Sequence, residues 1–308
     1  MARRKKGRSI HGWLVLDKPV GMTSTQAVGA VRRAFDARKA GHAGTLDPLA
    51  TGILPIALGE ATKTVPYAVD GQKSYRFTVR WGAQTDTDDA EGRTVKTSEA
   101  RCDRAAIEAV LPDFTGEIQQ VPPPFSAIKI DGNRAYDLAR SGEEVVLEAR
   151  TAQIDRLELV DMPDGDTAVF EADCGRGTYV RALARDMGRT LGCLGHVIAL
   201  RRTRVAGFSE AEAVTMQALQ EAAEAGSDEV ERLLLPIEAA LNELAALAVG
   251  QNDAARLLRG QAVLIRGRDA PMGGGATYAT CKGHLIAVGH VEKGELKPTR
   301  VFNFSEGS

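Results

Sequence analysis

The sequence is poor in cysteine and in aromatic residues, and it contains no long apolar segment. Its four cysteines are scattered over 308 residues and form no CxxC pair. This spacing argues against a zinc site and a disulfide framework, and it is typical of a protein from a reducing cytoplasm. A membrane-spanning helix needs about 18 or more consecutive apolar residues. None occurs here, so we expect no association with a membrane.

The motifs of several common cofactor sites are also missing. The chain has no phosphate-binding GxxxxGK[ST] loop, no GxGxxG after a predicted strand and no HExxH zinc motif. An enzyme with this sequence would therefore work without a nucleotide cofactor and without a metal ion. Hydrophobic residues make up 44% of the chain and charged residues 26%, a composition typical of a globular protein with roughly two domains.

Positive charge is concentrated in two places, although the net charge is −2. Residues 1–8 carry five basic groups and no acid, and residues 176–204 carry seven arginines against the single acid Asp186. This distribution gives a directional electrostatic field, which favours a polyanionic partner. The basic N-terminal segment taken alone is equally typical of a solubilising tail.

Local patterns predict both strands and helices in the first 82 residues. The apolar run WLVLDKP (13–19) predicts a strand, and Thr23 with Gln26 forms a capping box that opens a helix. The alternating segment YRFTVRWG (75–82) predicts another strand. The glycine-rich segment 41–59 is interpreted as a loop with at most one or two helical turns.

Shorter elements and one well-defined helix are predicted further along. The shorter elements are a polar turn or hairpin at 86–92, a helix over 103–111, a turn at Asp131-Gly132, a helix near 133–140 and a strand within 169–177. Thr178 then starts the clearest helix, and Gly192 ends it. Its arginines recur at i, i+4 and i+8 and share one face, a pattern also common on solvated helices. They are Arg181, Arg185 and Arg189.

The last hundred residues change character twice. The segment from about 207 to 245 is acidic and predicted to be helical. After Gly250, glycines are frequent and apolar alternation returns, which predicts a small β domain. Roughly sixty residues form only a marginal core, so we expect this domain to pack against the rest.

Asp47 lies in the segment GHAGTLDPLATG (41–52). An aspartate followed by proline is usually a helix cap, with the proline at the first helical position. Two features favour a functional role here. Glycines on both sides suit a backbone that must approach a ligand closely. The same segment also offers His42, Thr45 and Thr51, polar groups that a capping turn does not require.

Five segments, taken together and in order, resemble one known family. They are DKPVGMTS (17–24), GHAGTLDPLATGILPIALGEATK (41–63), KSYRFTVRWG (73–82), SAIKIDGNRAYDLAR (126–140) and CGRGTYVRALARDMGRTLGC (174–193), the last followed by LRRTRVAGF (200–208). They look very like the motifs of the bacterial tRNA pseudouridine-55 synthases, the TruB family. The likeness covers most of residues 12–208. Residues 284–302 resemble, more loosely, the small PUA RNA-binding domain of that family.

The resemblance implies a fold and a domain organisation. The fold is the pseudouridine synthase fold, an α/β (α+β) architecture on a mixed, mostly antiparallel sheet, followed by a small C-terminal β (PUA-like) domain. The expected parts are a basic tail (1–11), a catalytic domain (12–245) with an insertion near 83–150, and a PUA-like RNA-binding domain (246–308).

The resemblance also implies the reaction and the residues that perform it. The family breaks the N-glycosidic bond of uridine 55 in the T loop of tRNA, turns the uracil and rejoins it through carbon, without a cofactor. Asp47 would be the catalytic aspartate, Tyr75 would stack on the uracil, and Arg181 would pair with the carboxylate. Substrate-binding roles fall to His42, which would help to open the T loop, and to three residues that would line the pocket, Lys18, Tyr179 and Leu200. The expected partner is tRNA, bound through its T arm by a cytoplasmic monomer with no metal.

The chemistry of the residues agrees with this reaction. Detaching and rejoining a base needs a nucleophilic carboxylate in a dry pocket, and an adjacent arginine would keep that carboxylate ionised. The target uridine must also leave its stack to be reached.

Three alternatives remain open. An N-glycosidase would usually need a second carboxylate, and none is obvious beside Asp47. A non-catalytic RNA-binding or RNA-folding factor would not need the intact GTLDPLATG segment. A guide-RNA-dependent relative is disfavoured by the long insertion near 83–150.

Overall fold

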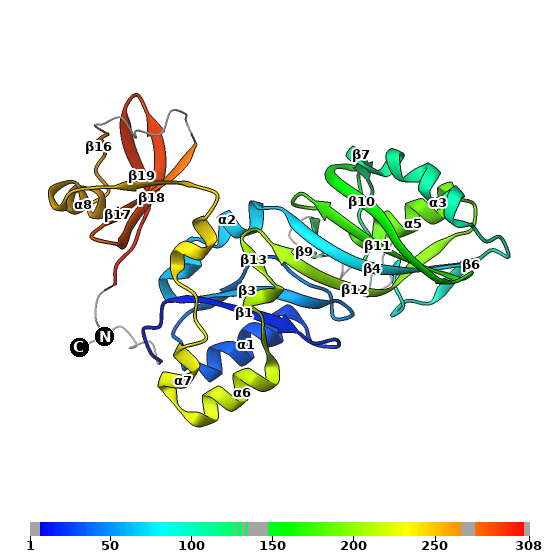
Figure 1. The fold of residues 1–308 in the computed structure, drawn as a ribbon, viewed down its shortest axis with the longest axis horizontal. Helices are drawn as coiled ribbons and strands as arrows, with labels where there is room; N and C mark the ends of the chain where they lie inside the picture. The colour runs from blue at the N-terminus through cyan, green and yellow to red at the C-terminus, as the bar shows by residue number, and fades with distance from the viewer. Residues whose placement is uncertain (1–6, 127, 131–132, 135–146, 266–274, 305–308) are drawn as a thin grey trace.

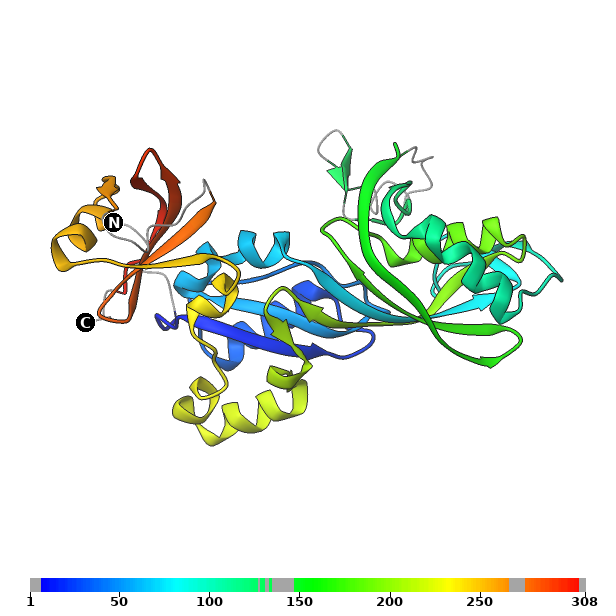
Figure 2. The ribbon, with the colours of Figure 1, turned by 45° about the horizontal axis from the view of Figure 1, so that its top comes forward.

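Two β-sheets of different size organise the chain (Figure 1). The computed structural model describes residues 7–126, 128–130, 133–134, 147–265 and 275–304. The larger sheet has ten strands and the smaller has five. The small sheet lies at one end of the molecule and the group containing α3 and α5 at the other, with the large sheet between them (Figures 1 and 2).

The large sheet is mixed and mostly antiparallel, as expected. Its strands, in spatial order, are β14 (Val214–Thr215), β1 (Gly12–Lys18), β3 (Thr51–Leu58), β12 (Gly195–Val205), β4 (Lys73–Trp81), β11 (Thr167–Cys174), β10 (Arg150–Asp164) and β7 (Gly116–Gln120). Two further strands pair at its side, β2 (Ala40–His42) with β3 and β13 (Phe208–Ser209) with β12. The pairs β1–β14 and β3–β12 are parallel, and the other pairs are antiparallel.

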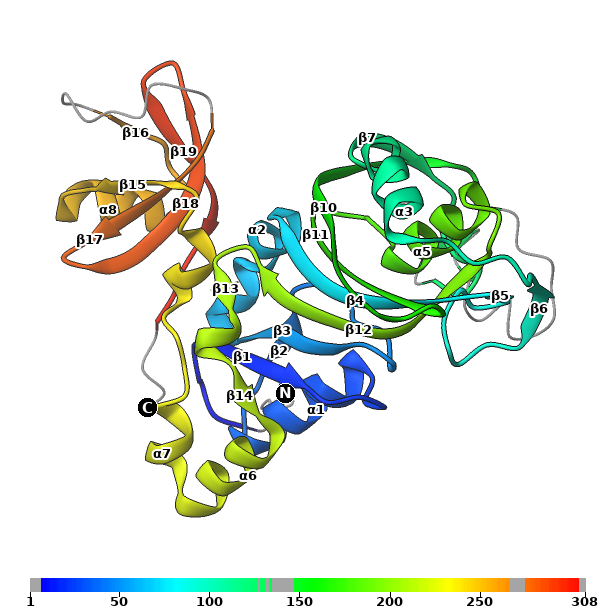
Figure 3. The ribbon, with the colours of Figure 1, turned by 45° about the vertical axis from the view of Figure 1, so that its right-hand side comes forward.

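Helices cover the sheet in separate groups. The α-helices are α1 (Ser24–Ala34), α2 (Val65–Asp70), α3 (Arg104–Val110), α5 (Val180–Thr190), α6 (Met216–Ala225), α7 (Ser227–Glu231) and α8 (Gln251–Leu258). The short 3₁₀ segments are η1 (Gly59–Lys63), η2 (Leu111–Phe114), η3 (Glu210–Glu212) and η4 (Ile237–Leu241). Helices α1, α6 and α7 lie together beside β1 and β14, whereas α5 packs on β12 at the other end (Figure 3).

The predicted helix starts are close to the observed ones. Thr23 caps α1 and forms the expected capping box with Gln26. Helix α5 begins at Val180 with Tyr179 as its N-cap, so its first residue lies two residues after the predicted start at Thr178. Its apolar side chains Val180, Leu183, Ala184 and Met187 are buried in the core.

The prediction of a loop over residues 41–59 holds for 43–50 but is wrong for the flanking residues. Residues 51–58 form β3, and residues 41–42 belong to β2. Strand β3 lies between β1 and β12 and is buried along nearly its whole length, and such central strands have continuous apolar sequences rather than alternating ones. The glycines serve a close approach: at Gly52 (φ 95°) an added Cβ would lie 2.2 Å from the Arg202 carbonyl oxygen.

The segment between β4 and β10 forms a second layer around α5. It contains the hairpin β5–β6 (Ala83–Thr85, Thr94–Thr97), helix α3 as predicted, and strand β7. A two-stranded ladder, β8 (Lys129–Ile130) with β9 (Asn133–Arg134), follows. The predicted helix therefore does not begin at 133, because those residues are extended. Its remainder, and the turn at Asp131-Gly132, lie outside the described residues.

The small sheet packs against the large one, as its size led us to expect. Its strands run in the order β15 (Ala245–Ala248), β17 (Ala276–Cys281), β18 (His284–Glu292), β19 (Glu295–Val301) and β16 (Val263–Leu264). Leu285, Val288 and Phe302 share a buried apolar cluster with Trp13 and Phe208 of the large sheet. The two sheets therefore have a common core at their junction.

Candidate active site

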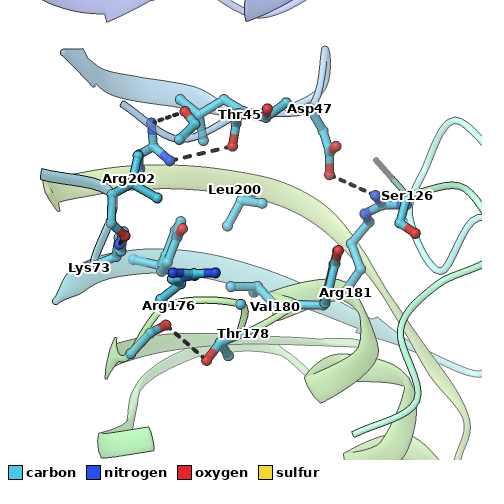
Figure 4. A pocket seen from close by; sticks show the side chains of 17 residues that line it. Thr45, Asp47, Lys73, Ser126, Arg176, Thr178, Val180, Arg181, Leu200 and Arg202 are labelled. Atoms are coloured by element: carbon cyan, nitrogen blue, oxygen red, sulfur yellow. Dashed lines mark hydrogen bonds and ion pairs between the residues drawn. The ribbon is translucent and has the colours of Figure 1, made fainter. Parts of the chain in front are cut away.

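A cavity of about 270 Å³ opens where strands β4 and β12 meet the start of α5 (Figure 4). Its walls come from the loop 44–47, from β4, from the segment 175–181 and from β12. These elements are far apart in the sequence, and the sheet pairings β3–β12 and β12–β4 bring them together. Five of the predicted site residues line this cavity: Asp47, Tyr75, Tyr179, Arg181 and Leu200.

Asp47 lies in a loop and does not start a helix. Its carbonyl accepts a hydrogen bond from the Ala50 amide at 3.1 Å, which closes a turn that leads directly into β3. The helix-cap interpretation is therefore excluded. The carboxylate is 38% exposed and lines the cavity, so it is accessible to a ligand.

Arg181 holds the Asp47 carboxylate from below (Figure 4). Its Nη2 lies 2.9 Å from Asp47 Oδ2, and the arginine side chain is only 6% exposed. The same guanidinium donates to the carbonyls of Thr87 (2.8 Å) and Phe125 (2.9 Å). Because the arginine is fixed by these bonds, the ion pair fixes the orientation of the carboxylate as well.

A second ionic network supports Arg181, and the sequence interpretation missed it. The segment 86–92 was predicted only as a polar turn, but Asp89 Oδ2 lies 3.4 Å from Arg181 Nη1 and Asp88 Oδ2 lies 2.9 Å from Arg185 Nη1. Burial raises the pKa of Asp88 to about 6, against the opposing effect of Arg185. The sequence does contain two adjacent acids and two arginines one helical turn apart. That pattern alone does not show which acid pairs with which arginine.

Arg202 fixes the loop that carries Asp47. Its buried guanidinium donates to the carbonyls of Ile53 (2.8 Å), Gly44 (3.1 Å) and Thr45 (3.4 Å). Three charge-assisted bonds to backbone oxygens restrain this loop without using a charged partner. The sequence interpretation treated Arg202 only as part of a basic segment.

Tyr75 lines the cavity from near the start of β4. It faces Arg202 across the β4–β12 ladder. Burial raises the pKa of the Tyr75 phenol, and the positive charge of Arg202 opposes this effect. The ring is therefore neutral at physiological pH, as a flat surface for stacking requires.

Gln120 positions Tyr179 from the neighbouring strand β7. Its side-chain Oε1 accepts from the Tyr179 amide at 2.8 Å, and its Nε2 donates to the Tyr179 carbonyl at 3.0 Å. Gln120 is only 2% exposed. This two-point contact fixes the backbone at the start of α5, two residues before Arg181.

Two family descriptions match consecutive parts of the chain. "TruB family pseudouridylate synthase (N terminal domain)" matches residues 32–180, and "tRNA pseudouridylate synthase B C-terminal domain" matches residues 181–242. The chain belongs to the TruB family of pseudouridylate synthases. The second match ends just before the small β-sheet begins at Ala245.

Curated TruB relatives cover nearly the whole chain. The "tRNA pseudouridine synthase B" of Bradyrhizobium diazoefficiens is 60% identical over 305 residues, which is 98% of this chain and 88% of the relative. The protein of the same name from Agrobacterium fabrum is 55% identical and covers 97% of each chain. That from Brucella melitensis is 52% identical over 98% of this chain and 99% of the relative.

Solved structures share the TruB fold at lower sequence identity. A chain of a Cbf5-Nop10-Gar1 complex has a TM-score of 0.72 and 24% identity, and it covers 95% of this chain and 84% of that one. A chain of an H/ACA RNP bound to a substrate RNA has a TM-score of 0.73 and 22% identity over 98% and 92%. At this identity the likeness concerns the fold alone.

Two residues assigned by the TruB resemblance do not line the cavity. Lys18 is fully buried, and its Nζ donates to the carbonyls of Pro19 (2.9 Å), Met22 (2.8 Å) and, at 3.4 Å, Pro48. It therefore ties the turn after β1 to the Asp47 loop. Burial lowers its pKa to about 8, although the charge of Asp47 opposes the shift. His42 lies on β2, and burial likewise lowers its pKa.

Most arginines of the 176–204 segment are buried or paired. Arg181, Arg185 and Arg202 are all 5% exposed or less. Arg201 pairs with Asp17 at 3.0 Å and with Glu210 at 2.6 Å. The arginines of this segment therefore form neither a solvated stripe nor one continuous phosphate-binding face. The two arginines of the segment that are exposed are Arg176 and Arg189.

Among the described residues, no group of three or more histidine, cysteine or acidic side chains is arranged to hold a metal ion. In the same part of the chain, no helix is long and apolar enough to cross a membrane.

Proposed function

We propose that this TruB-family enzyme isomerises uridine 55 in the T loop of tRNA to pseudouridine, with Asp47 as the nucleophile. The protein is a pseudouridine synthase that acts on tRNA, as its family and its relatives named tRNA pseudouridine synthase B indicate. The observation that carries the assignment of Asp47 is its place in the cavity. Among the described residues that line the cavity it is the one carboxylate, it is accessible, and buried Arg181 orients it.

The reaction conserves all atoms of the nucleoside. The bond between ribose C1′ and uracil N1 breaks, the uracil turns within the pocket, and a bond forms between C1′ and uracil C5. C5 loses its proton and N1 gains one, so the composition of the nucleoside is unchanged. Asp47 adds either to ribose C1′, at one end of the breaking bond, or to uracil C6, next to N1, and leaves when the new bond is complete. Arg181 engages one carboxylate oxygen, which leaves the other free for the attack.

The cavity is suited to holding a detached base. A volume of about 270 Å³ is large enough to accommodate one flipped nucleotide base. Tyr75 offers a ring for stacking, which contributes about 1–3 kcal/mol per base and so offsets the cost of flipping. Leu200 and Val180 add apolar surface, which limits the access of water to the intermediate.

The N-glycosidase alternative needs a second carboxylate that faces the substrate. Asp89 is one candidate, since it shares Arg181 with Asp47. It is buried, accepts from Thr87 Oγ1 (2.5 Å) and from the Glu91 amide (3.0 Å), and does not line the cavity. Asp89 thus supports the arginine and does not serve as an acid or base at the sugar.

The other two alternatives are disfavoured by different observations. A non-catalytic RNA-binding factor would have no need of an oriented, accessible carboxylate in a pocket. A guide-RNA-dependent activity is disfavoured because the chain is 52–60% identical to relatives named tRNA pseudouridine synthase B but only 22–24% identical to the chains of the Cbf5-Nop10-Gar1 and H/ACA RNP structures.

The small C-terminal sheet is assigned to tRNA positioning. We infer a PUA-like RNA-binding role for 246–308, with the T arm in the cavity of a monomeric, cytoplasmic enzyme. The cavity residues all precede Arg204, so the small sheet contributes to binding from outside the active site.

One experiment tests the assignment directly. Purified protein is incubated with unmodified tRNA without added cofactor, and pseudouridine is mapped by position. We expect modification at uridine 55 by the wild type and none by Asp47→Asn. The variant should bind tRNA within about tenfold of the wild type, because it keeps the side-chain shape. Modification elsewhere would contradict the assigned position, and turnover of a few per cent by Asp47→Asn would remove the residue from its role.

A further inference from the structure

Arg176 differs from the other cations around the cavity because its guanidinium is in solvent. The charged side chains that line the cavity are Asp47, Lys73, Arg176, Arg181 and Arg202. Arg181 and Arg202 are buried and bonded to carbonyls of the protein. Lys73 is also buried, and it donates to the carbonyls of Val69 and Gly71 at the end of α2. Arg176 is thus the lining cation able to meet an incoming phosphate.

Arg176 is held at the rim by one exposed carboxylate. Its Nη1 donates to Asp70 Oδ1 at 2.6 Å, and the two side chains are 68% and 59% exposed. Asp70 is the last residue of α2 and also lines a second cavity of about 240 Å³. The ion pair therefore lies on the ridge between the active-site cavity and this neighbouring one.

The position of Asp70 is unfavourable for both helix stability and RNA binding. A negative charge at the C-terminal end of a helix opposes the helix dipole. A carboxylate at the mouth of a site for a polyanion also repels the substrate. The ion pair with Arg176 offsets this unfavourable charge in the free protein.

We propose that the Arg176–Asp70 ion pair closes the rim of the cavity in the free enzyme, and that a backbone phosphate of the tRNA replaces Asp70 as the partner of Arg176 when the target nucleotide enters. This inference rests on the proposed function, because it takes RNA as the substrate. Arg176 is then a substrate-binding residue, and Asp70 is a competing internal anion.

Replacing Asp70 by a phosphate as the partner of Arg176 requires little free energy. An exposed ion pair contributes little to stability because water screens it and two flexible side chains must be ordered. A phosphate accepts two parallel bonds from a guanidinium and binds it more strongly than a single-point carboxylate contact does. Gly175 and Gly177 flank Arg176, and Gly177 has φ 86°, so the backbone on either side carries no side chain that would obstruct the phosphate.

The exchange also selects between RNAs. Asp70 competes with any phosphate that reaches the rim, so a loosely bound RNA gains little from Arg176. A tRNA whose T arm is already docked presents its phosphate at a high effective concentration and displaces Asp70. Removing Asp70 should therefore strengthen binding and weaken discrimination against RNA without a T arm.

The test measures binding and turnover in matched variants. Dissociation constants for a T-arm hairpin are measured at several salt concentrations in the Asp47→Asn background, in which no turnover occurs. Values of kcat and KM are measured with unmodified tRNA in the otherwise wild-type enzyme. The variants are Arg176→Ala, Asp70→Asn and, as a control, Asp166→Asn. Asp166 also forms an exposed ion pair, with Arg101, so the control removes the same charge at a different place.

The expected results have opposite signs for the two partners. Arg176→Ala should raise Kd and KM about tenfold at low salt and reduce the log–log salt slope by about 0.7–0.9, the share of one phosphate contact. Its kcat should stay within about threefold, because Arg176 contacts phosphate rather than the base. Asp70→Asn should lower Kd about three- to tenfold at low salt, while Asp166→Asn changes it less than about twofold.

Two outcomes would overturn the proposal. Binding that is unchanged or weaker in Asp70→Asn would mean that Asp70 does not compete with RNA, and an unchanged salt slope in Arg176→Ala would mean that Arg176 meets no phosphate. If the wild type modifies tRNA in the same assays, only the exchange is refuted. A wild type that leaves tRNA unmodified would instead contradict the proposed function.

Discussion

The two-point contact between Gln120 and the Tyr179 backbone gives a prediction about stability, pH and turnover together. The Gln120 amide makes bonds of 2.8 and 3.0 Å and is 2% exposed. Gln120→Ala leaves the Tyr179 amide without its partner, at a cost of about 1–3 kcal/mol, whereas the Tyr179 carbonyl keeps its bond from the Leu183 amide (3.1 Å). We expect the variant to lose about 1–3 kcal/mol of unfolding free energy and roughly 2–5 °C in Tm.

Gln120→Glu makes the same contact sensitive to pH. The introduced carboxylate still accepts from the Tyr179 amide but places a second oxygen 3.0 Å from the Tyr179 carbonyl, where Gln120 donates. Only the protonated carboxyl restores that bond, so its pKa in the folded state is raised above the unfolded value of about 4.3. The variant should therefore be closest to the wild type at low pH and lose stability as the pH rises through the raised pKa.

Thermal unfolding at about pH 5 and pH 8, together with kcat on tRNA, tests both variants. A shift of about 1 Å in the start of α5 would displace Arg181 and cost roughly tenfold to a hundredfold in kcat. Gln119→Ala is the matched control, since Gln119 is exposed on the same strand and bonds only to Thr151 Oγ1 (3.0 Å). A Gln120→Ala variant as stable and active as this control would refute the reasoning, as would a pH-independent Gln120→Glu.

Three further predictions follow from the site and the small sheet. Tyr75→Phe should keep far more activity than Tyr75→Leu, since stacking needs a ring and no hydroxyl; equal loss of kcat in both would assign acid–base chemistry to the phenol. Because burial raises the pKa of Asp88 to about 6, the stability of the wild type relative to Asp88→Asn should fall by about 2–3 kcal/mol as the pH rises from about 4 to 6 in urea unfolding. A flat difference would contradict this. A chain ending after Leu244 should show a raised KM for tRNA with kcat within several-fold, once gel filtration confirms a folded monomer despite the loss of Phe302 from the shared core. A hundredfold lower kcat at unchanged KM would mean that the small sheet contributes to the catalytic step itself.

Local sequence patterns predicted the elements whose signals are contained within a few residues. The capping box at Thr23 and the alternation of β4 are complete within the segments that they define. The strand within the segment 41–59 was missed because the glycines there resemble a loop, whereas Gly52 permits the close approach of Arg202, about 150 residues later in the chain. No pattern within the segment contains that information.

The cavity-lining residues were found through the family motifs, and the supporting residues were not. Asp47 and Arg181 belong to recognisable segments, and the structure brings them together. Asp89 and Gln120 act on these residues from the region between β4 and β10, where their segments look like a polar turn and an ordinary edge strand. Their roles depend on tertiary contacts between residues far apart in the chain. No recurring spacing in a single sequence predicts such contacts.

The bonds from Arg202 to the Asp47 loop also set an order of events during synthesis on the ribosome. The guanidinium and its carbonyl partners at Gly44, Thr45 and Ile53 are separated by 149–158 positions. At about 5–20 residues per second, the loop emerges roughly 8–30 s before the arginine that restrains it. The nascent chain thus carries Asp47 for many seconds without a formed cavity, which is completed only when β12 inserts between β3 and β4.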